Sequence, residues 1–219
     1  YGQTFITLLR DLKGKEADAV PLAVRDYFSR HRDDARRWPS DEEFHRAWTS
    51  QRAYKRLQVR GIRMILKTLE ASLATDLQET VTYHPNISVE HVLPVQWRKN
   101  WPEPDPALAT LDESAEEVRD RLLHTFGNLT LLTQKLNSKN SNAPFKTKKR
   151  LITKNSVLRL SVHFHDADTW DEHAILERAE ELFKTATGIW PHRPTTPAAD
   201  TQAVTGPRLS LQERHLSLR

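Results

Sequence analysis

Cysteine is absent from this 219-residue sequence. Without it the chain can form neither disulfide bonds nor zinc sites built on thiolates, and its absence favours a reducing compartment, so we expect a cytoplasmic protein. Long apolar runs are missing too: no stretch approaches the roughly 18 apolar residues that a membrane-spanning helix needs, and no signal peptide opens the chain. With 37% hydrophobic residues and a mean hydropathy of -0.67, the composition predicts a polar, soluble protein with no membrane partner, long enough to bury a core.

Acidic residues are missing from a long internal stretch. From Arg121 to His165 there is no Asp or Glu, but there are nine Lys and Arg residues. A segment that carries only positive charge is expected of a surface that binds phosphate groups, although many charge runs are merely solvated. We predict DNA binding here, mainly through backbone contacts, because no long helix presents Arg, Asn and Gln at a spacing suited to reading bases. The residues predicted to contact DNA are Lys135, Lys139, Lys146, Lys148, Lys149 and Arg150.

Polar residues stand at the ends of the strands predicted in the middle of the chain. Glu90 and His91 lie near the end of a predicted strand over residues 87–93. Asn128 lies at the start of the next predicted strand, and Asn137 lies where a helix is expected to begin. The order strand, loop, strand, helix, with polar groups at the junctions, is the layout of a ββα-metal nuclease site.

Phosphodiester hydrolysis explains these residue types. A base must take a proton from the attacking water, and histidine suits this role because it titrates near neutral pH. A divalent cation on the phosphate offsets the charge of the transition state and of the departing 3′ oxygen. Magnesium prefers oxygen ligands and keeps several waters, so one carboxylate and one amide oxygen can hold it.

The Glu-His pair carries a geometric condition. Neighbouring residues of an ideal strand point to opposite faces of the sheet. Glu90 and His91 can therefore share one site only where the strand ends or bulges. This condition predicts a distorted strand end, with Leu93 and Pro94 as the terminator.

Several motifs together resemble a known nuclease family. EHVLP, FGNLTLL, LNSKNSN and APFKTKK are similar to motifs of the carboxy-terminal domain of GmrSD-type restriction enzymes, which is an HNH, or His-Me finger, endonuclease. KRLQVRGIRMILKTLE and TWDEHAILERAEELFKTATGIW resemble the helices that precede and close that domain, so the resemblance covers roughly Phe44 to Pro191. It implies a metal-dependent DNA endonuclease of a bacterial restriction or antiviral defence system. Some similar proteins act on phosphorothioate-modified DNA and carry an amino-terminal nucleotide-hydrolysing domain.

The resemblance also implies a role for each motif residue. His91 aligns with the general base and Glu90 with the metal carboxylate that precedes it. Asn128 matches an asparagine that steadies the loop and orients the histidine. Asn137 matches a metal ligand that is histidine in other HNH branches, and asparagine binds metal more weakly. Lys148 falls where a basic residue would contact the scissile phosphate. The expected metal is Mg²⁺, with Mn²⁺ as the alternative.

Other readings of these residues stay open. Each asparagine could be an ordinary turn or helix cap, and Asn140 or Asn142 could replace Asn137 as the ligand, because a shift of one helical turn exchanges them. His163 and His165 alternate as on a strand face and are not expected to bind zinc. The rival function is a non-catalytic, basic DNA-binding or protein-docking domain, and a second rival is an RNA-cleaving enzyme of the same chemistry.

The fold class expected from these patterns is α+β: a mostly α-helical domain with an embedded ββα-metal site. Capping boxes open two of its helices at Ser40 and Ser114, and Asp168 or Thr169 is expected to cap the last long helix. A single site cuts one strand, so a monomer should nick DNA. Because the chain begins with Tyr1 inside a predicted helix, we expect a fragment that lacks an amino-terminal domain. The predicted parts are a helical scaffold (1–82), a ββα-metal nuclease core (83–160), a closing helix region (161–190) and a flexible tail (191–219).

Overall fold

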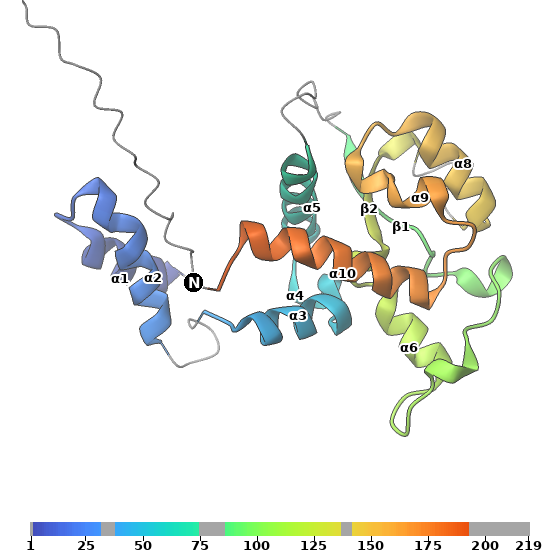
Figure 1. Ribbon diagram of the computed structural model, residues 1–219, viewed down its shortest axis with the longest axis horizontal. Helices are drawn as coiled ribbons and strands as arrows, with labels where there is room; N and C mark the ends of the chain where they lie inside the picture. The colour runs from blue at the N-terminus through green and yellow to red at the C-terminus, as the bar shows by residue number, and fades with distance from the viewer. Residues whose placement is uncertain (1, 32–37, 75–85, 137–141, 193–219) are drawn as a thin grey trace, which may run out of the picture.

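The computed structural model describes residues 2–31, 38–74, 86–136 and 142–192, and within these ranges it contains a small two-stranded sheet with helices packed on both faces (Figure 1). The fold class predicted from the sequence, a mostly helical α+β domain, is confirmed. The helices that precede the sheet in the chain are α1 (Gly2–Leu12), α2 (Val20–Arg30), α3 (Asp41–Ser50), α4 (Ala53–Arg56) and α5 (Val59–Leu73). The sheet and the later helices are β1 (Ile87–His91), α6 (Ala115–Leu122), β2 (Leu129–Thr133), α8 (Phe145–Asn155), α9 (His163–Asp166) and α10 (Glu172–Ile189). Within the described ranges, the structure has no helix with the length and apolarity to cross a bilayer.

The two strands are antiparallel and carry a separate apolar core on each face. Their register runs without interruption from the pair Ile87 and Thr133 to the pair His91 and Leu129. Side chains alternate between the faces of a strand, so Leu129 and Leu131 enter a core with α3, α5 and α10, whereas Leu132 enters a core with α6 and α8. The sheet is therefore covered on both sides, and a polar side chain on either face is drawn into a packed environment.

The last long helix is fixed against the turn that leads into β2. Gly127 lies so close to α10 that an added Cβ would be 2.1 Å from the carbonyl oxygen of Ile175. Arg178 is fully buried, and its guanidinium donates hydrogen bonds to the carbonyls of Gly127 (2.8 Å) and Leu129 (3.0 Å). Glycine is required here by this close approach, and the arginine satisfies carbonyls that would otherwise be buried without partners.

Three local expectations need correction. The helix α10 is capped by Asp171, whose side chain accepts from the amide of Ala174 at 3.0 Å, and not by Asp168 or Thr169. The strand β1 ends at His91, two residues earlier than expected, because both backbone polar groups of Leu93 bond to the side chain of Asn128. The alternating histidines lie in the short helix α9 and not on a strand. The two expected capping boxes, by contrast, are both formed.

Candidate active site

A buried ion pair joins the end of β1 to α8. Glu90 projects from the face of the sheet that α8 covers, and the ammonium of Lys148 donates to its Oε1 at 2.6 Å. The same ammonium donates to the carbonyl oxygen of His91 at 2.8 Å. Lys148 is 0% exposed and Glu90 is 8% exposed. Lys148 reaches this position because it shares the inward face of α8 with Phe145 and Ile152, three residues before it and four after it.

The imidazole of His91 lies on the opposite face of the strand. Its ring stacks on Tyr54 of α4, with centroids 5.3 Å apart and planes at 20°. Its Nε2 is 3.1 Å from Nδ1 of His124, which lies just beyond the end of α6, and these two rings meet edge to face. No hydrogen-bond partner for Nδ1 of His91 is found among the residues the structure describes. One ring nitrogen of His91 is thus held by His124, and Nδ1 has no hydrogen-bond partner among the described residues.

The strand end is regular and not distorted. Pairing continues without a bulge to His91, so Glu90 and His91 leave the strand on opposite faces, as in an ideal strand. The expected distortion is therefore wrong, and β1 ends at His91, before the expected terminator of Leu93 and Pro94. The two side chains therefore lie on opposite faces of the sheet at the end of β1.

Asn128 clamps the chain that follows the strand end. Its Oδ1 accepts from the amide of Leu93 (2.8 Å) and from the indole of Trp170 (3.0 Å). Its Nδ2 donates to the carbonyls of Leu93 (2.8 Å) and Leu123 (3.0 Å). Both donors and both acceptor positions of the carboxamide are used in a fully buried place. Asn128 therefore fixes the backbone next to His91, which agrees with a loop-steadying role, and none of these four hydrogen bonds joins it to the imidazole.

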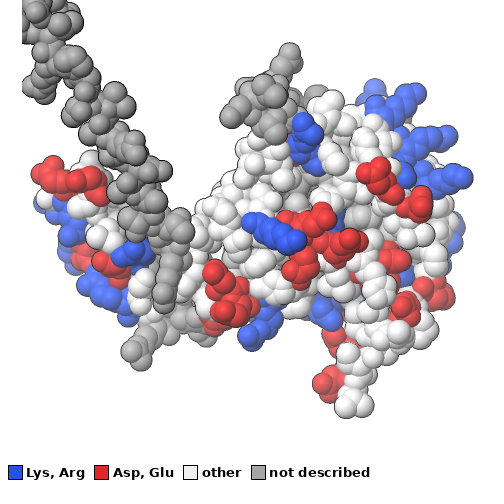
Figure 2. Space-filling model, viewed as in Figure 1, with Lys and Arg blue, Asp and Glu red and all other residues white. Residues whose placement is uncertain are grey.

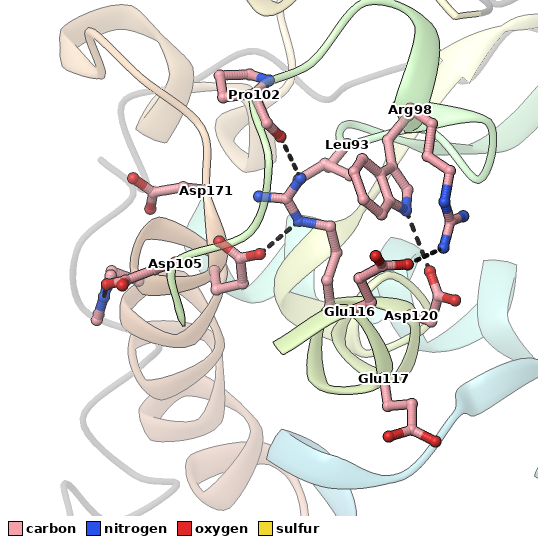
Figure 3. A network of polar contacts seen from close by, with 12 residues as sticks. Leu93, Arg98, Pro102, Asp105, Glu116, Glu117, Asp120 and Asp171 are labelled. Atoms are coloured by element: carbon pink, nitrogen blue, oxygen red, sulfur yellow. Dashed lines mark hydrogen bonds and ion pairs between the residues drawn. The ribbon is translucent and has the colours of Figure 1, made fainter. Parts of the chain in front are cut away.

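A second network holds the segment after the strand end from its other side (Figure 3). Arg119 of α6 donates to Glu172 of α10 and to the carbonyl of Pro102. Its guanidinium lies 4.5 Å from the centre of the Trp97 ring, and the indole of Trp97 donates to Asp120 at 3.1 Å. The chain that follows Glu90 and His91 is thus fixed on both sides, which preorganises the strand end.

The remaining predicted site residues are distributed unevenly. Asn137, Asn140 and Lys139 lie outside the described residues. The Nδ2 of Asn142 donates to Oε1 of Gln96 at 2.9 Å, so Asn142 contacts the segment after β1.

The outer surface of α8 is basic. Figure 2 shows Lys and Arg side chains gathered over this helix, and Lys146 and Arg150 are exposed there. Lys135 is exposed just after β2, whereas Lys149 is half-buried and donates to the carbonyl of Ala167 at 2.8 Å. Lys148 is the exception: because its ammonium is sealed from solvent, it can contact a phosphate only if the pair with Glu90 opens. Phosphate contact by any of these lysines stays a prediction.

Burial dominates the electrostatics of the strand end. It raises the pKa of Glu90, opposed by the attraction of Lys148, and it lowers the pKa of Lys148, opposed by Glu90. Burial, with the charges of His124 and Lys148, lowers the pKa of His91 to about 3. Burial, followed by the charge of Arg52, also lowers the pKa of His124. Both imidazoles are therefore neutral at neutral pH, and each has one nitrogen with a free lone pair.

The donors at the strand end fit a hard cation only in part. A carboxylate such as Glu90 is a ligand that Mg²⁺ prefers, and Mg²⁺ binds through one or two carboxylates with water and substrate phosphate completing its shell. In the part of the chain that the structure describes, no group of three or more His, Asp or Glu could hold a metal. The carboxylate of Glu90 is therefore a suitable ligand for Mg²⁺, but the described residues supply too few ligands by themselves. Water and substrate phosphate would have to complete the coordination shell.

The comparison with known families agrees with this geometry. Residues 38–185 match the family described as GmrSD restriction endonucleases, C-terminal domain. The chain belongs to this family. The resemblance inferred from the motifs is thus confirmed, and membership identifies the chain in broad terms as a nuclease domain of a restriction endonuclease. No curated protein matches the chain. In this GmrSD domain the matched range contains the described residues of the candidate site, from Tyr54 to Lys148.

Sequence reasoning missed two residues of this arrangement. Tyr54 was expected to be scaffold, and His124 was given no role, yet both contact the ring of His91. His124 is 33 residues from His91 in the sequence, and no local motif connects them. The one available signal was its place two residues before the Phe-Gly-Asn turn, which returns the chain to the sheet.

Proposed function

We propose that this GmrSD domain is an HNH-type, metal-dependent endonuclease that nicks DNA, with His91 as the general base. The observation that carries the proposal is a neutral imidazole with one free nitrogen, placed at a strand end one residue from a buried carboxylate. A base must be unprotonated to act, and burial keeps His91 in that form; with a pKa of about 3 the ring is a weak base, so the reaction would also need a bound metal that acidifies the attacking water.

The chemistry assigned to the chain is a single displacement at phosphorus. A water oxygen forms a bond to phosphorus while its proton passes to Nδ1 of His91, and the bond from phosphorus to the 3′ oxygen breaks. The departing oxygen takes a proton from water, and His91 later returns its proton to solvent. A bound divalent metal, Mg²⁺ or Mn²⁺, would offset the charge on the phosphate. Glu90 is the described residue that would hold it, with Asn137 as the predicted second ligand.

The basic surface of α8 would hold the DNA backbone beside this strand end. Exposed Lys146 and Arg150 can pair with phosphates at any sequence, which suits a nuclease that acts without strong base preference. The finer biological setting belongs to the same proposal: antiviral restriction, phosphorothioate-linked defence and an amino-terminal nucleotide-hydrolysing partner domain.

The second candidate is a non-catalytic DNA-binding domain. It is favoured by the contact of Lys148 with Glu90, because a lysine already neutralises the carboxylate that a metal would need. In that case Lys148 and Glu90 form a structural pair, and only the basic surface is functional.

Nicking of a supercoiled plasmid tests the two candidates. We expect open circles with Mg²⁺ and none with chelator, and we expect folded His91→Ala to lose nicking while the exposed His165→Ala, its matched control, keeps it. Retained nicking in His91→Ala would refute the proposed base. DNA binding that persists in chelator, with no cleavage under any metal, would favour the binding domain. A matched RNA substrate tests the choice of nucleic acid.

A further inference from the structure

Two side chains fix the orientation of the His91 ring. The near-parallel stack on Tyr54 sets the plane of the imidazole, and the hydrogen bond with His124 sets its rotation within that plane. These two residues are themselves joined, because the carbonyl of His124 accepts from the amide of Ala53 at 2.8 Å, next to Tyr54. The two residues that orient His91 thus come from α4 and from just beyond the end of α6. Neither segment takes part in the ion pair of Glu90 and Lys148.

The hydrogen bond between the two histidines can be formed in two ways. Either Nε2–H of His91 donates to Nδ1 of His124, or Nδ1–H of His124 donates to Nε2 of His91. Only the first leaves a lone pair on Nδ1 of His91. The second places a proton there and leaves the ring without a basic nitrogen for water.

The charge of Lys148 favours the first arrangement. Its ammonium bonds to the carbonyl oxygen of His91, so a positive charge lies on the backbone side of that residue. By covalent structure, Nδ1 is the ring nitrogen nearer the backbone. A nearby positive charge stabilises a lone pair and disfavours an N–H at that nitrogen. The proton is therefore placed on Nε2, where it points at His124.

We propose that His124 is a positioning residue for His91: its Nδ1 accepts from Nε2–H of His91 and so keeps Nδ1 of His91 as the basic nitrogen. This inference rests on the proposed function of His91 as base. When His91 takes a proton from water, its Nε2–H becomes the donor of a charge-assisted hydrogen bond, which is stronger than the neutral one. His124 then stabilises the imidazolium without accepting its proton.

Three variants separate positioning from a merely structural role. His124→Phe keeps a flat ring but removes the acceptor, and His124→Asn keeps a polar atom near the place of Nδ1. The control is His165→Phe, on the exposed side of α9. We expect His124→Phe to lower kcat for plasmid nicking about 10- to 100-fold, the usual effect of losing a residue that orients a functional histidine, with KM changed less than about twofold. We expect His124→Asn to recover most of kcat and the control to match the parent. Nicking by folded His124→Phe at the parent rate would overturn the proposal.

The tautomer of His91 can be measured without metal, DNA or cleavage. Side-chain ¹⁵N–¹H correlation spectra of the unsubstituted chain at neutral pH, assigned by the signal lost in His91→Ala, report which ring nitrogen carries the proton. We expect Nε2–H, and a weaker preference in His124→Phe. A parent spectrum with Nδ1–H would overturn the inference even if the plasmid is nicked. If the plasmid is never nicked but His91 shows Nε2–H, the proposed function fails while the geometry inferred for the pair stands.

Discussion

The pair formed by Glu90 and Lys148 makes a quantitative prediction about stability. Lys148→Met keeps most of the apolar stem but removes the ammonium, so the carboxylate of Glu90, 8% exposed, is left without its cation. Removing one partner of a buried ion pair costs about 3 to 5 kcal/mol. A domain of this kind is stable by roughly 5 to 15 kcal/mol, so the loss should be a large fraction of the total.

The size of the effect should depend on the presence of the partner. In Glu90→Gln/Lys148→Met both charges are gone, and we expect the double variant to lie within about 1 kcal/mol of the parent, because neutral replacements of a buried pair are often tolerated. Since each single variant should lose about 3 to 5 kcal/mol, the coupling energy between the two sites should be roughly 5 kcal/mol or more, far above the roughly 0.3 to 0.5 kcal/mol expected for independent sites.

Urea unfolding followed by circular dichroism at neutral pH measures the free energy of unfolding of the parent, Glu90→Gln, Lys148→Met and the double variant. The control is Lys146→Met, on the exposed side of the same helix, where a change within about 0.5 kcal/mol is expected. In a thermal scan the Lys148→Met loss should appear as a decrease in Tm of roughly 6 to 20 °C. A change as small as that of the control would refute the reasoning: Lys148 would then not be held by Glu90, and it would be free to contact phosphate as the motif comparison implied.

Two further predictions follow from the packing and burial around the same strand. Gly127→Ala should destabilise the domain by about 3 kcal/mol or more, because its Cβ would lie 2.1 Å from the carbonyl oxygen of Ile175. Gly188→Ala, with no atom within 4 Å of the added Cβ, should be neutral or stabilising by up to about 1 kcal/mol. Equal losses of stability for the two variants in urea unfolding would contradict the close approach at Gly127. The pKa of His91 is about 3 in the folded domain and 6.5 in the unfolded chain, so the unfolded chain binds more protons between these values. Stability should therefore fall by about 1.5 kcal/mol from this residue between pH 6.5 and pH 5. His91→Phe should remove that part of the pH dependence and the exposed His165→Phe should not, so identical pH profiles for the parent and His91→Phe would refute the burial of a neutral imidazole.

Local features of the fold were predictable because their causes are local. The capping box at Ser40 needs only residues up to Glu43, and both of its hydrogen bonds form. The strands were expected from alternation of apolar residues, but their ends were not, since the end of β1 is set by the distant side chain of Asn128. Propensity predicts where a strand can form, and tertiary hydrogen bonds decide where it stops.

The residues of the candidate site were predictable, whereas their partners were not. The order of the motifs predicted Glu90, His91 and Lys148 as site residues. In the structure the ammonium of Lys148 donates to the carboxylate of Glu90 and to the backbone carbonyl of His91. It was not foreseen that Lys148 would be buried, although its spacing from Phe145 and Ile152 puts all three on one helical face. The charge of Lys148 predicted an exposed side chain. Its helical spacing from Phe145 and Ile152 predicts a buried one, and the structure agrees with the spacing.

The adjacency of Glu90 and His91 can now be explained by the alternation of the strand. If the carboxylate contacted the imidazole, it would raise the pKa of the ring. Because neighbours point to opposite faces, Glu90 is neutralised by Lys148 on one side while His91 contacts only uncharged rings on the other. Burial is the main cause of the low pKa of His91, and the charges of His124 and of the ammonium on the carbonyl of His91 lower it further. A regular strand end thus keeps an acid and a base one residue apart in sequence without allowing them to neutralise each other.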